Sequence, residues 1–383
     1  MPPPRERSAA VDRLRGVAVL TMVIWHTADG WLTERPSAEW FFWVRLCGAM
    51  AAPLFLLLAG VGVALREDTS SETIDRRLLA RGAGIFLLGV ALQFQHWLLD
   101  ALGILSLPGA FAAGGVGLFF YIIFKHLRAD GLKSKGREDP RLVVVAAIGL
   151  VAIGLSVGTA GPRDATVVLR GDVLHTIGLF VGLASLRPLR TRPLLVAGLL
   201  VVASVGFGAQ PSISAWRFPP LPWLSYGFIG LAIFRWRTHR SKARARDVDT
   251  SMLVVGLALI LFCSERQPVI YRLLRDAPEL TPAIRIGFRV GVAILLGGVV
   301  FVVGSFVPQR GFGPLALLGR HSLLIYWLHL ELSYGIASRP LRSRLDVVQW
   351  VTALTMLIVL LIGIAWSWDK RKKRRRVFSF EKS

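Results

Sequence analysis

The stretch VDRLRGVAVLTMVIWHTADGWL, residues 11–32, joins a long apolar run to charged residues at its start and a histidine near its end. No A-x-A-like cleavage site follows the run, so we expect an uncleaved membrane helix rather than a removed signal peptide. A membrane span needs about 20 apolar residues. Further runs of this kind recur along the chain, which predicts a protein that crosses the membrane many times.

Composition supports this prediction over a soluble fold. The 383 residues are 54% hydrophobic and 18% charged, whereas soluble domains carry about 25% charged residues. The expected fold class is an all-α, polytopic integral membrane helical bundle of about 10–12 transmembrane helices. The candidate spans are 14–31, 40–65, 78–98, 100–125, 141–160, 172–187, 193–210, 221–236, 251–271, 286–307, 314–336 and 347–368. A tight turn is expected around Asp100.

The net charge of +22 is interpreted first as a topology signal. Its lysines and arginines fall between apolar runs, notably at 125–141, 235–246 and 370–376, rather than on a soluble face that could bind nucleic acid. The positive-inside rule then places both termini in the cytoplasm of a cell (inner) membrane protein. The expected divisions are a cytoplasmic segment 1–11, a membrane domain 12–368 and a basic tail 369–383. The basic clusters either set topology and contact anionic lipid or receive an anionic cofactor.

One face of the first span gathers polar groups. The stripe contains Asp12, Arg15, Val19, Met22 and His26, and its arginine and histidine lie about 16 Å apart along the helix axis. Charged groups inside spans usually face the bundle interior. An arginine can hold an anionic donor and a neutral imidazole can accept a proton. The alternative is an ion pair at the helix end with an interfacial histidine.

Three further residues are candidates for supporting roles. Arg45 either pairs with Glu39 or faces the active cavity. His175 follows Asp172 by three residues, a spacing that can orient the imidazole. The alternative that we favour is that Asp172 caps the helix and His175 is only interfacial. His329 either hydrogen-bonds between spans or lines the same cavity as His26.

A metal or disulfide site is not expected. Cys47 and Cys263 both lie in apolar stretches, which leaves too few cysteines for a disulfide framework or a zinc site. None of the seven histidines has the H-x-x-x-H or H-E-x-x-H spacing.

Several segments resemble transmembrane acyltransferases, in order along the chain. DRLRGVAVLTMVIWH (12–26) is similar to the opening of the acyltransferase-3 family, with its R-x10-H motif, and of the bacterial relatives of heparan-α-glucosaminide N-acetyltransferase. The other similar segments are APLFLLLAGVGVAL (52–65), RRLLARGAGIFLLG (76–89), GDVLHTIGL (171–179), LPWLSYGFIGLAI (221–233) and LGRHSLLIYWLHLEL (318–332).

The resemblance implies an enzyme that moves an acyl group, acetyl foremost, from cytoplasmic acyl-CoA to a hydroxyl or amine of a sugar or glycolipid acceptor. It implies His26 as catalytic base or transient acyl carrier, and Arg15, Arg77 and Arg81 as donor-binding groups. The donor is a substrate, so no tightly bound cofactor is expected. The bilayer is the remaining partner, with a homodimer left open. The rival interpretations are a transporter or flippase that uses the same side chains and a non-catalytic membrane scaffold.

Overall fold

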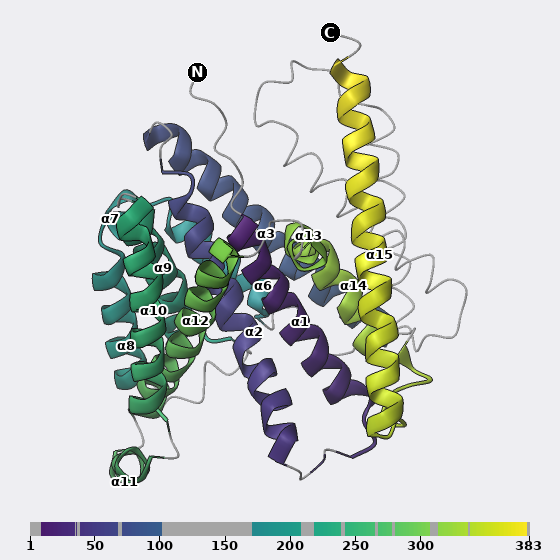
Figure 1. Cartoon of the computed structure of the whole chain (residues 1–383), viewed down its shortest axis with the longest axis horizontal. Coiled ribbons are helices and arrows are strands. Elements are labelled where there is room, and N and C mark those ends of the chain that lie inside the picture. The colour runs from purple at the N-terminus through teal and green to yellow at the C-terminus, as the bar shows by residue number, and fades with distance from the viewer. Residues whose placement is uncertain are drawn as a thin grey trace. The chain divides into compact units, whose positions relative to one another are not determined.

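A computed structural model describes residues 9–34, 36, 39–67, 71–101, 171–207, 218–238, 242–264, 267–277, 280–306, 313–335 and 338–380. Every regular element named in these ranges is a helix (Figure 1). The helices are α1 (Ala9–Trp31), α2 (Glu39–Ala64), α3 (Ser71–Ala101), α6 (Val173–Leu183), α7 (Arg187–Thr191), α8 (Pro193–Phe207), α9 (Pro220–Thr238), α10 (Lys242–Phe262), α11 (Pro268–Asp276), α12 (Thr281–Phe306), α13 (Gly313–Arg320), α14 (Ser322–Tyr334) and α15 (Val347–Phe380).

The described helices include four that are long and apolar enough to cross a membrane. They are Glu39–Ala64, Ile74–Gln95, Thr281–Val303 and Val347–Arg371. Val173–Leu183 and Pro193–Gly206 are shorter apolar helices. The prediction of an all-α membrane bundle is therefore confirmed. The candidate spans 100–125 and 141–160 lie outside the described residues, except that α3 reaches Ala101.

The chain divides into two compact units, one made of residues 1–58 and 233–383 and the other of residues 59–232. In the first unit, α1 contacts α12, α13, α14 and α15, and Figure 1 shows α13, α14 and α15 beside it. The buried apolar side chains around α1 include Val19, Val23, Leu318, Ile325 and Leu361. The helix predicted from the sequence as the first span thus packs against four other helices of this unit.

The crossing of α1 and α13 is set by two glycines. A Cβ on Gly319 would overlap the Asp12 carbonyl, and a Cβ on Gly16 would overlap the Leu315 carbonyl. Small residues permit this close approach of backbones between membrane helices. The glycines therefore fix where α13, and the α14 that follows it, lie along α1.

The C-terminal end of α1 is tied to the segment before α15. Ser343 N–H donates to the Gly30 carbonyl at 3.1 Å, and Arg344 and Leu345 N–H donate to the Trp31 carbonyl at 3.0 and 2.9 Å. These bonds satisfy carbonyls that a helix end otherwise leaves without an intrahelical partner. The end of α1 that carries His26 is thus held in place.

The second unit also packs its helices through glycines. A Cβ on Gly82 of α3 would meet the backbone of Gly178 and Gly182 in α6. In the same unit, the buried Arg190 side chain donates to Asp75 Oδ1 at 2.5 Å and to the Ala184 carbonyl at 2.9 Å. Its Nε lies 3.6 Å from Glu67 Oε1. An arginine therefore joins α3 to the segment after α6.

Three predicted boundaries were wrong. The candidate span 314–336 is two helices, because the backbone leaves the helical region at His321 (φ −108°, ψ 21°) just after Gly319 meets α1. The candidate span 251–271 begins earlier, at Lys242, and ends at Phe262, and a new helix starts at Pro268, a residue favoured at the first helical position. No tight turn interrupts α3 at Asp100, since the helix continues to Ala101.

Candidate active site

The structure brings His26 of α1 and His329 of α14 together. His26 Nδ1 lies 2.9 Å from His329 Nε2, and the two rings are nearly parallel, with centroids 5.1 Å apart. His329 is fully buried, whereas His26 is partly exposed. The catalytic candidate and a supporting candidate predicted from the sequence thus form one hydrogen-bonded pair.

The surroundings of His329 determine which nitrogens carry protons. Its Nδ1 lies 3.0 Å from the Ile325 carbonyl oxygen, which can only accept, so Nδ1 carries the hydrogen. In a neutral ring Nε2 then has a lone pair, and it accepts from His26 Nδ1–H. The lone pair of neutral His26 is consequently on Nε2, the nitrogen turned away from the pair.

Tyr334 and Asp29 extend the cluster at the ends of α14 and α1. The Tyr334 ring packs against His26, with centroids 5.3 Å apart and the planes tilted by 55°, and its hydroxyl donates to Asp29 Oδ2 at 3.0 Å. A Cβ on Gly30 would meet the Ser333 carbonyl at 2.8 Å, so this close packing requires a glycine there. The contacts fix the tyrosine ring beside the imidazole.

A second buried hydrogen bond fixes α1 next to His26. Trp350 Nε1 of α15 donates to Thr27 Oγ1 at 3.1 Å, and the threonine hydroxyl donates to the Val23 carbonyl at 2.9 Å. Both side chains are buried. The residue that follows His26 is therefore anchored to α15, while His26 itself is anchored to α14.

At the other end of α1, Asp12 and Arg15 form an ion pair with an N–O distance of 3.5 Å. Asp12 is buried and Arg15 keeps a side-chain exposure of 22%. Between this pair and His26 the stripe is filled by buried Val19 and Met22. The predicted stripe is thus the inward-facing side of α1, and the helix-end ion pair expected as the alternative is present.

The remaining predicted site residues do not join the histidine pair in the described contacts. Arg77 and Arg81 are exposed on α3, one turn apart, and belong to the other unit. Arg45 is exposed on α2, which does not match a cavity position, and among the described residues it forms no ion pair with Glu39.

His175 acts as a helix cap. Its Nδ1 accepts from the Asp172 backbone N–H at 3.0 Å, and Asp172 Oδ1 accepts from Val173 N–H at 2.7 Å. The ring is buried edge-on against Phe86, and a Cβ on Gly89 would meet it. The helix cap by Asp172 is as expected, but His175 is not interfacial: it is buried and completes a capping box within the second unit.

Sequence reasoning missed Tyr334, Asp29, Thr27 and Trp350 at the site. The signal for Asp29 was its position three residues after His26, which places both on neighbouring parts of one helix face. No comparable signal marked Tyr334, because its partner is 305 residues away in sequence. Among the described residues, no group of three His, Cys, Asp or Glu side chains could hold a metal ion.

Residues 7–273 match the sequence model of the family heparan-alpha-glucosaminide N-acetyltransferase, catalytic. The matched region covers more than half of the chain. The chain belongs to this family. It is therefore a membrane protein of an acyltransferase family, which favours a transferase over the transporter alternative. The matched region includes His26, and His329 lies beyond it. A comparison with curated proteins gives no match.

Proposed function

We propose that this family member transfers an acyl group, acetyl foremost, from acyl-CoA to a hydroxyl or amine of a sugar or glycolipid acceptor. The observation that carries the proposal is the His26–His329 hydrogen bond. It leaves the Nε2 lone pair of His26 as the basic atom of the site, and a neutral imidazole is the side chain most often used as a general base near neutral pH.

The proposed reaction uses His26 Nε2 for two proton movements. Nε2 takes the proton of the acceptor hydroxyl or amine while the acceptor atom forms a bond to the thioester carbonyl carbon. The carbon–sulfur bond then breaks, and the CoA sulfur takes the proton from His26. In the two-step variant, Nε2 attacks the thioester carbonyl carbon and the carbon–sulfur bond breaks, which releases the CoA thiolate. The acceptor atom then bonds to the acyl carbon as the carbon–Nε2 bond breaks, and the acceptor proton passes to the thiolate.

His329 and Tyr334 have positioning roles in this proposal. The imidazolium that forms on His26 donates from Nδ1 to a buried neutral acceptor, and hydrogen bonds to charged groups are stronger than neutral ones. Tyr334 limits how the His26 ring can turn, because its own hydroxyl is held by Asp29. The ring is therefore set in place before a substrate binds.

The donor is proposed to approach from the cytoplasmic side of an inner membrane, where Arg15, Arg77 and Arg81 would attract its phosphates. The support is their chemistry and the exposure that each retains. Arg15 already faces Asp12, so it would have to exchange one carboxylate for a phosphate.

The test is transfer of labelled acetyl from acetyl-CoA to a panel of amino and neutral sugars by purified protein in vesicles. His26→Ala should lower the rate of acetyl transfer roughly 10²–10⁴-fold, which is the contribution of a general base. The matched control is His321→Asn, because His321 lies in the same unit and faces Asp369 at 3.4 Å. Wild-type activity of His26→Ala would overturn the proposal. Label retained on wild-type protein, but not on His26→Ala, would indicate the two-step variant.

A further inference from the structure

The short helix α11 (Pro268–Asp276) joins the ends of α10 and α12. α10 and α12 pack closely, since a Cβ on Gly256 would meet the backbone of Leu295 and a Cβ on Gly291 would meet Leu259. Gly287 of α12 lies against Cys263, the residue after α10. The connection therefore starts where α10 ends beside the second turn of α12, and all three helices belong to the same unit.

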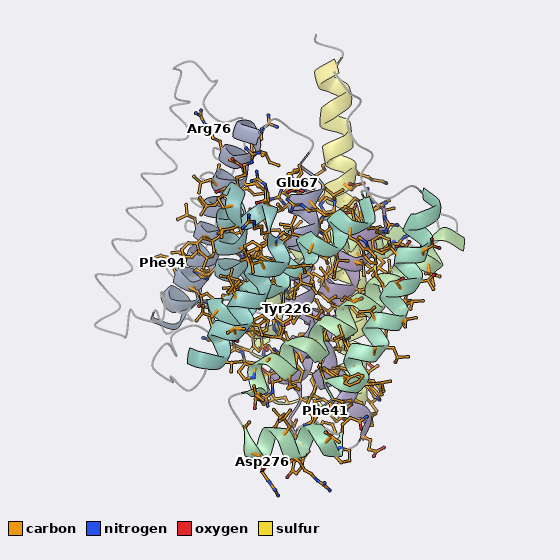
Figure 2. The ribbon with its side chains drawn as sticks, turned by 90° about the vertical axis from the view of Figure 1, so that its left-hand side faces the viewer. Phe41, Glu67, Arg76, Phe94, Tyr226 and Asp276 are labelled. Atoms are coloured by element: carbon orange, nitrogen blue, oxygen red, sulfur yellow. The ribbon has the colours of Figure 1, made fainter. Side chains whose placement is uncertain are left out.

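The axis of α11 lies crosswise to the helices that it connects. Figure 1 looks down α11, which is drawn end-on as a ring, while α10 runs across the line of sight. In the perpendicular view of Figure 2, the helix labelled at Asp276 is seen from the side, across the end of the unit. Because α12 is a candidate span, a helix crosswise to its end lies parallel to the membrane surface.

The residues of α11 divide into two faces. Val269 and Leu273 are one turn apart, as are Ile270 and Leu274, and these four form the apolar face. The opposite face carries Arg272 and Arg275, whereas Asp276, at the end of the helix, lies at the border of the two faces, on the side of Val269. No residue of α11 is buried, and exposure reaches 76% at Val269. An apolar face left open in this way marks an interaction surface.

The neighbouring surface is also apolar. The last residues of α10, a few positions before α11 in the chain, are exposed, Leu261 by 53% and Phe262 by 77%, so apolar side chains are open on both helices. Tyr271, 66% exposed, lies at the border of the two faces, where its ring suits the headgroup level. Arg275 lies 3.3 Å from Asp276, whereas Arg272 adds a second cation to the polar face.

We propose that α11 is an interfacial helix that binds the surface of the phospholipid bilayer, with a preference for anionic headgroups. Val269, Ile270, Leu273 and Leu274 enter the boundary between headgroups and acyl chains, and the arginines face the phosphates. A basic amphipathic helix lying in the membrane plane binds by this combination of apolar burial and charge attraction. The inference does not depend on the proposed transferase reaction.

The experiment uses spin labels on the full chain in vesicles of phosphatidylcholine and phosphatidylglycerol, with Cys47 and Cys263 replaced by serine. Single cysteines are introduced as Val269→Cys and Leu273→Cys on the apolar face, and as Arg272→Cys and Arg275→Cys on the polar face. Labels on the apolar face should collide more with oxygen and less with a water-soluble nickel complex than labels on the polar face. All four positions are exposed, so the labels should not disturb folding.

Two outcomes would overturn the bilayer assignment. Equal access of the nickel complex at all four positions would place α11 in water, and protection of the apolar face from both reagents would place it against protein. The charge preference is tested by Arg272→Gln with Arg275→Gln, which should reduce the depth of the Val269→Cys label only in vesicles with phosphatidylglycerol. Arg344→Gln is the control, and an unchanged depth in the double variant would refute the preference.

Discussion

Replacing His329 by leucine should slow catalysis without unfolding the protein. Leucine is close in size and keeps the buried position filled, but it removes the Nε2 acceptor that lies 2.9 Å from His26 Nδ1. The imidazolium formed during transfer would then lack this bond. A hydrogen bond to a charged group contributes about 1.5–3 kcal/mol, which corresponds to a rate loss of roughly 10- to 150-fold.

The loss should appear in kcat rather than in KM, because the bond strengthens only when His26 becomes charged. His329→Gln is the matched variant, since its amide oxygen can accept in place of the imidazole Nε2. It should recover part of the rate. The assay is release of the CoA thiol at saturating donor, with thermal unfolding of each variant measured in parallel.

A clear result would refute this reasoning. Suppose that His329→Leu retained kcat within a factor of about two, which is less than the effect of losing one such hydrogen bond. The histidine pair would then not determine the protonation and orientation of His26 during transfer. Equal losses in the leucine and glutamine variants, with matching falls in Tm, would show that His329 serves packing alone.

Other substitutions test the neighbouring contacts. Gly319→Ala should destabilise the protein by about 1–3 kcal/mol or more, because its Cβ would overlap the Asp12 carbonyl, and thermal unfolding in detergent measures this. Tyr334→Phe should keep the free energy of unfolding within about 1.5 kcal/mol of wild type but lower kcat, because the ring loses its hydrogen bond to Asp29. An unchanged kcat would exclude a positioning role for Tyr334. Arg190→Met should reduce stability by about 1–3 kcal/mol, since the partly exposed Asp75 and Glu67 lose a charged hydrogen-bond partner, and a Tm equal to that of wild type would contradict this.

Much of the architecture was predictable because helices leave a local signal. The apolar runs near α1, α2 and α15 coincide with the observed helices to within a few residues at most of their ends. The inward face of α1 was also predictable, because its polar residues recur at helical spacing. The positions of these helices and the inward face of α1 follow from local periodicity alone, so no contact with another helix needs to be known.

The boundaries that failed lie next to side-chain and backbone contacts that hydropathy does not report. The helix break at His321 comes two residues after Gly319, which packs against Asp12, more than 300 residues earlier in the sequence. α10 begins with the polar stretch from Lys242, where Asp249 is paired with Arg237 at 2.7 Å. A hydropathy average does not register either contact. It therefore places the start of α10 too late in the sequence and merges α13 with α14.

The site shows the same division. The presence of His26 on the interior face followed from spacing, and a cavity shared with His26 was one of the two alternatives for His329. The pairing itself, and the choice of protonated nitrogen, required the Ile325 carbonyl to lie 3.0 Å from His329 Nδ1. Arg45 was misjudged because an apolar sequence neighbourhood does not say which side of a helix a residue occupies.

The hydrogen bonds from Ile325 through His329 to His26 form a row of dipoles that all point the same way. The row starts at a peptide carbonyl, which no change of side chain at position 325 can remove and which does not titrate in the working range of a protein. An aspartate in place of His329 would set the same direction, but it would put an anion at a fully buried position, at a cost of several kcal/mol. The orientation of the basic nitrogen thus comes from the main chain, without a fixed charge.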